Sequence, residues 1–82
     1  MKHAGPAALD ALADLIGSIR EQSELKESRP GVFYRKGKAY LHFHEDPAGL
    51  FADLRVSTEW ERFPVSEADE RARFLEVVER SL

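Results

Sequence analysis

The stretch YLHFHEDPAGLFADLRV, residues 40–56, contains two runs in which apolar and polar residues alternate, separated by a short acidic turn. Alternation with a period of two is typical of a β-strand with one buried face. In the first run Leu41 and Phe43 form the apolar set, and in the second run Leu54 belongs to the matching set. The stretch therefore predicts two antiparallel strands that share one apolar face.

The register of these two strands follows from the same pattern, because a slip of one residue would exchange the two faces. A four-residue turn at 46–49, with proline second and glycine last, keeps the apolar residues on one side. This turn sets the pairs Leu41–Leu54, Phe43–Ala52, His42–Asp53 and His44–Phe51. We expect the first two pairs to be buried and the other two to lie on the opposite face.

A second hairpin precedes this one, in the segment GVFYRKGKAYLHFHE, residues 31–45. The Lys36-Gly37 pair between two β-prone runs indicates a two-residue turn. Regular pairing from this turn places Val32 and Tyr34 on the Leu41 face, with Phe33 opposite Tyr40 on the other face.

The ends of the chain carry helical patterns. Apolar residues recur at three- and four-residue steps from about Pro6 to Ile19, and the polar run up to Pro30 is expected to end that helix. The segment STEWERFPV, residues 57–65, indicates at most a short edge strand, and Ser66 is expected to cap a second helix.

The sequence predicts a single α+β domain over residues 1–82, a two-layer sandwich in the order α-β-β-β-(β)-α. Its strands form an antiparallel meander, and both terminal helices cover one face because the Leu41 face needs a cover. The other face is left uncovered. We expect it to carry Phe33, Tyr40, His42, His44, Phe51, Asp53 and Arg55.

Composition limits the possible functions. The chain has 82 residues, no cysteine and a net charge of −3, which excludes disulfides and disfavours a general affinity for nucleic acid. No apolar run approaches the ~20 residues that span a bilayer, and no signal peptide is recognisable, so cytoplasmic residence without membrane contact is expected. No nucleophile is identifiable beside His42, so we expect a non-enzymatic protein without a cofactor and assign no catalytic residue.

Two interpretations of the uncovered face remain open. The first is protein interaction or self-association as a homodimer, because aromatic residues, arginine and histidine are enriched at interfaces. The alternative is a small-ligand or metal site built on His42, His44 and Asp53. Since a metal site needs three or four ligands and the two histidines supply half of them, we expect no metal. In that case His42 pairs with Asp53, which raises the pKa of His42, and His44 packs on Phe51.

The run RPGVFYRKGKAYLHFHEDPAGLFADLR, residues 29–55, resembles the hairpin of small uncharacterised bacterial proteins described as domains of unknown function. A looser similarity links the chain to α+β proteins of the MmcQ/YjbR kind, which also place a GK hairpin after a helix. This chain is shorter than that fold. The resemblance implies a small α+β fold and assigns no functional residue.

Overall fold

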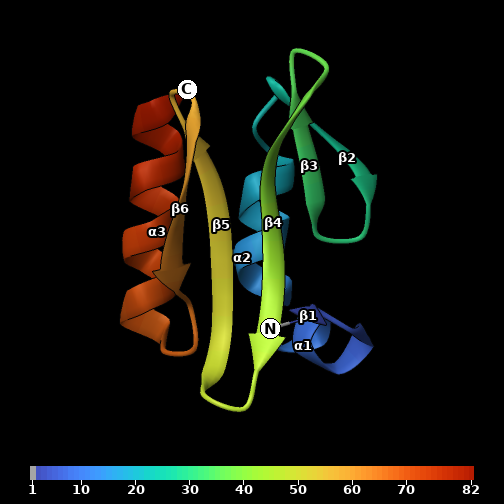
Figure 1. Cartoon of the computed structure of the whole chain (residues 1–82), viewed down its shortest axis with the longest axis vertical. Helices are drawn as coiled ribbons and strands as arrows, with labels where there is room; N and C mark the ends of the chain where they lie inside the picture. The colour runs from blue at the N-terminus through green and yellow to red at the C-terminus, as the bar shows by residue number, and fades with distance from the viewer. Residues whose placement is uncertain (1) are drawn as a thin grey trace.

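The computed structural model describes residues 2–82 as a sheet of antiparallel strands with helices on one side (Figure 1). In chain order the elements are β1 (Lys2–His3), α1 (Pro6–Ala11), α2 (Ala13–Arg20), β2 (Leu25–Arg29), β3 (Val32–Arg35), β4 (Lys38–Asp46), β5 (Gly49–Val56), β6 (Glu59–Pro64) and α3 (Ala68–Ser81).

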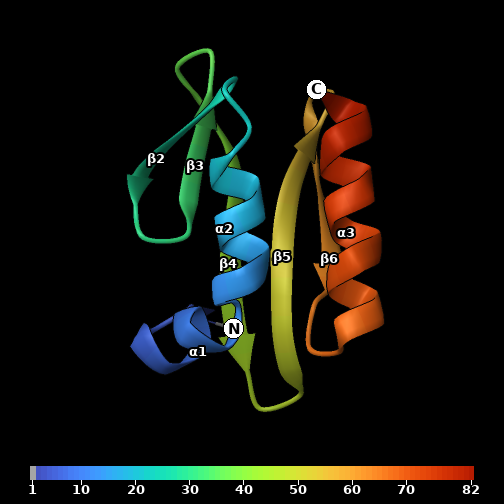
Figure 2. The ribbon, with the colours of Figure 1, turned by 180° about the vertical axis from the view of Figure 1, so that it is seen from behind.

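The sheet is a meander in the order β2-β3-β4-β5-β6, and β1 pairs with the part of β4 that β3 leaves free. Helices α2 and α3 contact each other and lie on the same side of the sheet, as the view from behind shows (Figure 2). The predicted α+β architecture with helices on one face is therefore confirmed, although the sheet has more strands than expected. Among residues 2–82, no helix has the length and apolar character to cross a membrane.

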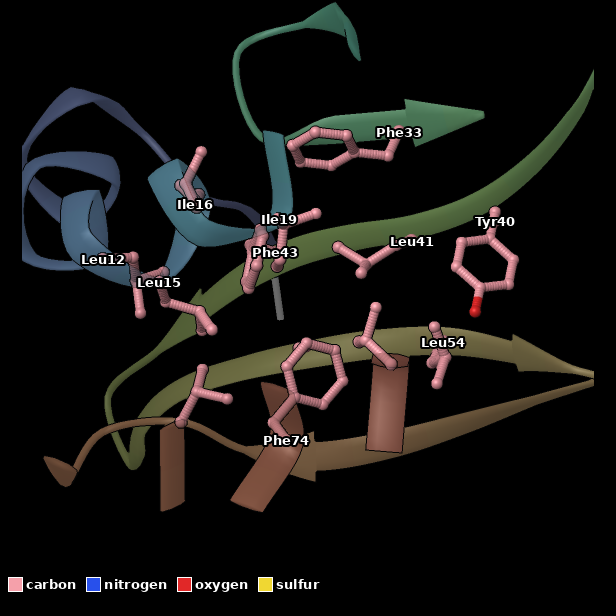
Figure 3. Packing of buried hydrophobic residues seen from close by; sticks show 14 of the residues in the cluster. Leu12, Leu15, Ile16, Ile19, Phe33, Tyr40, Leu41, Phe43, Leu54 and Phe74 are labelled. Atoms are coloured by element: carbon pink, nitrogen blue, oxygen red, sulfur yellow. The ribbon is translucent and has the colours of Figure 1, made fainter. Parts of the chain in front are cut away.

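The core lies between this sheet face and the helices (Figure 3). Leu41, Phe43 and Leu54 from the central strands are fully buried against Ile19 of α2 and Phe74 of α3. Each large apolar side chain buried in this way contributes about 1.5–3 kcal/mol, so the central hairpin supplies much of the stability.

The register predicted for β4 and β5 is confirmed. Leu41 pairs with Leu54, Phe43 with Ala52, His42 with Asp53 and His44 with Phe51. The turn holds Pro47 and Ala48 at its centre, and the Ala48 amide donates a hydrogen bond to the Asp46 carboxylate.

The pairing of β3 with β4 departs from the prediction two residues after the turn. Lys36 and Gly37 form the turn with φ of 52° and 80°, and Tyr34 pairs with Ala39 as expected. The register then shifts, so that Phe33 pairs with Leu41 and Tyr40 is an extra residue, a β-bulge.

The bulge brings two aromatic residues into the core. Phe33 is 1% exposed and Tyr40 5% exposed, and the Tyr40 hydroxyl hydrogen-bonds with Ser81 of α3. Placing Phe33 and Tyr40 on the uncovered face was therefore wrong. The burial of two rings and the hydroxyl partner compensate for the interrupted ladder.

Two further segments differ from expectation. The polar run at 25–29 forms the edge strand β2 and is tied to α2, since Arg20 donates two hydrogen bonds to Glu27. At the start of α3 the cap is Glu67 and not Ser66, and the Glu67 amide donates to the Glu70 carboxylate at 2.9 Å. Ser66 instead accepts a hydrogen bond from the Leu50 amide at 2.8 Å.

Candidate metal centre on the uncovered face

The site lies on the sheet face opposite the helices, where neighbouring strands place side chains in two adjoining rows. One row runs from His42 on β4 through Asp53 on β5 to Arg62 on β6. In the adjoining row His44 of β4 lies beside Phe51 of β5. His42 and His44 point to the same side because they are two residues apart on one strand.

Asp53 is the buried charge of this cluster, with a residue exposure of 6%. Its two oxygens accept hydrogen bonds from Arg62 Nε at 2.7 Å and Nη2 at 2.9 Å. Burial alone would raise the pKa of Asp53, but the hydrogen bonds and charge of Arg62, helped by the two histidines, lower it below the usual value. Asp53 is thus an anion at neutral pH.

His44 lies beside this carboxylate without bonding to it. Its Nε2 is 3.0 Å from Asp53 Oδ2, but the two groups are not aligned for a hydrogen bond. Both ring nitrogens are buried, and neither has a hydrogen-bond partner among the described residues. Nε2 therefore has only its ion-pair contact with Asp53, and a buried nitrogen without a well-aligned hydrogen bond is costly, so this side chain is suited to an additional partner.

The ring of His42 makes an edge contact with the ring of His44 and a tilted contact with the indole of Trp60. The ring centroids are 4.6 Å apart for the two histidines and 4.7 Å apart for His42 and Trp60. Burial lowers the pKa of His42, His44 adds to the effect, and Asp53 opposes it without reversing it. The expectation that pairing with Asp53 leaves the pKa of His42 raised was therefore wrong, because burial and the neighbouring His44 outweigh the charge of Asp53.

The donor atoms are close enough to share one ion. One ligand atom each from His42, His44 and Asp53 lies within 4.8 Å of the others. Donors bound tetrahedrally at about 2.0–2.1 Å are about 3.4 Å apart, so small side-chain rotations would bring these three into a coordination shell. Two imidazoles and a carboxylate suit zinc and also ferrous iron.

A third histidine stands next to the cluster. His3 of β1 pairs with His44 across the strands, and their rings are 6.4 Å apart. Three protein ligands leave a tetrahedral ion with one open position, which water can fill, and His3 lies in the neighbouring shell.

The structure brings five of the seven predicted residues of the uncovered face together there: His42, His44, Phe51, Asp53 and Arg55. Sequence reasoning missed His3, Trp60 and Arg62 because β1 and β6 were not assigned as paired strands. The alternation of Trp60, Arg62 and Pro64 in β6 was the available signal, since it places all three on the face of Asp53. The predicted stacking of His44 on Phe51 is replaced by ring contacts with His42 and His3.

Comparison with models of protein families, with curated proteins and with solved structures finds no match for this chain, so its resemblance to small bacterial domains stays a prediction.

Proposed function

We propose that this chain is a small metal-binding domain that holds a divalent ion of the zinc class between His42, His44 and Asp53. The observation that carries the proposal is His44, whose two buried nitrogens have no hydrogen-bond partner although a carboxylate and a second imidazole lie beside them. A bound cation would satisfy Nε2 of His44 and the Asp53 carboxylate together.

The protonation states favour this ligand set. The lowered pKa of His42 keeps its imidazole neutral at neutral pH, and the lowered pKa of Asp53 keeps its carboxylate ionised. These are the forms that bind metal, so no proton has to be removed from either group at pH 7.

Arg62 is the competitor of the ion. In the metal-free protein its guanidinium supplies the positive charge that Asp53 requires, and its side chain is half exposed. An ion that binds Asp53 takes over this charge balance, and the flexible arginine can turn toward solvent. Replacing Arg62 therefore distinguishes two roles of the cluster, a metal site and an ion-pair cluster that only stabilises the fold.

The test is a calorimetric titration with Zn²⁺, followed by thermal melts. We expect one zinc equivalent to bind, and free zinc at a hundredfold excess over Kd to add about 2.7 kcal/mol to the free energy of unfolding. The gain should disappear in His42→Ala and in His44→Ala. It should be lost in Asp53→Asn and kept in Asp69→Asn, which changes an exposed aspartate on α3.

Arg62→Gln completes the design. We expect this variant to be less stable without metal and to bind zinc at least as tightly as the unchanged protein. If neither the unchanged protein nor Arg62→Gln binds zinc, and the variant is only less stable, the proposal is contradicted.

A second candidate function is self-association through the uncovered face, and Trp60 favours it. Trp60 is 41% exposed on that face, a large aromatic side chain of the type that dominates interfaces. Under this proposal Trp60→Glu is expected to convert a micromolar dimer into a monomer in sedimentation experiments. Val56→Glu, at a residue that is 40% exposed on the other face, is the matched control. A protein that is monomeric at hundreds of micromolar contradicts this candidate.

A further inference from the structure

A second polar site lies at the end of the sheet that carries the β3–β4 and β5–β6 turns, and no histidine lines it. A hollow of about 280 Å³ opens there, and four of its lining residues are Arg35, Lys36, Lys38 and Arg55. None of the residues that line it is acidic. The chain as a whole has a net charge of −3, so this hollow reverses the sign of the molecule locally.

The lysines of this hollow are not neutralised by the protein. Among residues 2–82, Lys36 and Lys38 form no ion pair with a carboxylate. Both lie at the tip of the β3–β4 hairpin, Lys36 in the turn itself with φ of 52°. Their ammonium groups are available to a ligand as two adjacent point charges.

The two arginines are held in place beside the lysines. Arg55 donates from Nε to the carbonyl of Ala39 at 2.8 Å, which fixes its side chain along the hollow. Arg35 donates from Nη1 to the Ser81 carbonyl at 3.2 Å and from Nη2 to the Glu24 carboxylate at 3.5 Å, with which it forms an ion pair. The Nε of Arg35 is buried and has no hydrogen-bond partner there. Preorganised guanidinium groups of this kind suit phosphate oxygens.

We propose that this hollow binds a small polyanion with two linked phosphate groups, as in pyrophosphate or the diphosphate of a nucleotide. Lys36, Lys38 and Arg55 supply three positive charges around the hollow, and the fourth, on Arg35, is shared with Glu24. These charges match the three to four negative charges of a diphosphate, and arginine forks beside lysine point charges are the usual partners of phosphate. A longer polyanion such as RNA would meet exposed Glu24 and Glu59 beyond the hollow, so a small ligand is favoured.

The experiment is a titration followed by amide NMR at constant ionic strength, with inorganic phosphate, pyrophosphate and a nucleoside diphosphate as separate probes. We expect saturable shifts at the amides of Lys36–Tyr40 and Ser57, with pyrophosphate binding at least tenfold more tightly than phosphate. Equal affinity for pyrophosphate and the nucleoside diphosphate assigns recognition to the phosphates alone. Tighter binding of the nucleoside diphosphate than of pyrophosphate would indicate an additional contact between the protein and the nucleoside.

Two variants test the residues. Lys38→Gln changes an exposed residue at the hairpin tip, and we expect it to weaken pyrophosphate binding at least fivefold. Arg55→Gln should weaken it similarly, whereas Arg73→Gln, an exposed arginine on α3, should leave it unchanged. Shifts that spread over the surface without saturation, or an unchanged affinity in Lys38→Gln, would overturn the proposal.

Discussion

Asp53 and Glu27 are both carboxylates held by an arginine, but their surroundings give them different roles. Asp53 is buried in the sheet between Arg62 and two histidines, so under the metal proposal an ion at the uncovered face replaces Arg62 as the partner of its charge. Glu27 lies at the sheet edge, where it accepts hydrogen bonds from Arg20 and from the Gly31 amide. Glu27 therefore holds β2 and its turn in place, and its carboxylate oxygens are used in these hydrogen bonds.

The role of Glu27 leads to a prediction on pH. The hydrogen bond from Arg20 is the main reason that the pKa of Glu27 lies below its usual value of 4.5, with the Gly31 amide and the Arg20 charge acting in the same direction against burial. A lowered pKa means that the stabilisation is fully present above the unfolded-state pKa and is lost as pH falls through the folded-state pKa.

We therefore expect Glu27→Gln to reduce the free energy of unfolding at pH 7 and to leave it nearly unchanged near pH 2. Urea denaturation at a series of pH values measures this. A difference between the two proteins that stays constant over the whole range would show that the charge of Glu27 contributes nothing.

The strands differ in how well their sequences reveal them. In β4 and β5 the alternation is strong and both faces have distinct characters, so the register, with the pairs Leu41–Leu54 and His42–Asp53, was predictable. The bulge at Tyr40 was not predictable. A regular ladder and a bulged ladder bury different aromatic rings, and the local sequence favours neither of them. The choice depends on Ser81 of α3, which is distant in sequence and accommodates the Tyr40 hydroxyl.

Strands β1 and β2 lack a signal of this kind. The segment LKESR of β2 is polar apart from Leu25, and it is held by its ladder with β3 and by the Arg20–Glu27 pair rather than by an apolar face. Strand β1 has two residues and exists only because β4 extends past the end of β3. Tertiary pairing overrides local preference in both segments.

The turns that end these strands supply a second prediction. Gly31 and Gly37 both have positive φ, 76° and 80°, so alanine at either position costs about 1–2 kcal/mol in backbone conformation. A Cβ at Gly31 would also lie 2.7 Å from Leu9 Cδ2, whereas one at Gly37 would meet nothing within 4 Å. Gly31→Ala should therefore lower the free energy of unfolding by more than Gly37→Ala does. Equal losses in denaturant titrations would show that Leu9 moves aside freely.

The whole molecule has one sheet with helices on a single side, and this arrangement creates the candidate site. Apolar side chains of β4 and β5 are used against α2 and α3, which leaves His42, His44 and Asp53 on the face that no helix covers. The sequence predicted these three residues as neighbours. It could not reveal that Arg62 holds Asp53 or that the ring nitrogens of His44 make no hydrogen bond among the described residues, because both depend on side-chain geometry across strands.

The same arrangement makes the stability of the molecule depend on a few central residues. Leu41 is fully buried between the sheet and the helices, so Leu41→Ala is expected to cost about 2–5 kcal/mol through lost burial and the cavity left behind. Val56→Ala, at a residue that is 40% exposed, should cost less than about 1 kcal/mol. Thermal melts compare the two, and equal effects would mean that the helices do not pack on Leu41.

Anomalous diffraction at the zinc edge, from crystals grown with one equivalent of Zn²⁺, tests the metal site most directly. The metal proposal predicts a single strong peak about 2.0–2.2 Å from a nitrogen of His42, a nitrogen of His44 and an oxygen of Asp53, with Arg62 turned away from the carboxylate. A peak elsewhere, such as at Glu45 in the hollow beside Lys2, or no peak with Arg62 still bound to Asp53, would contradict it.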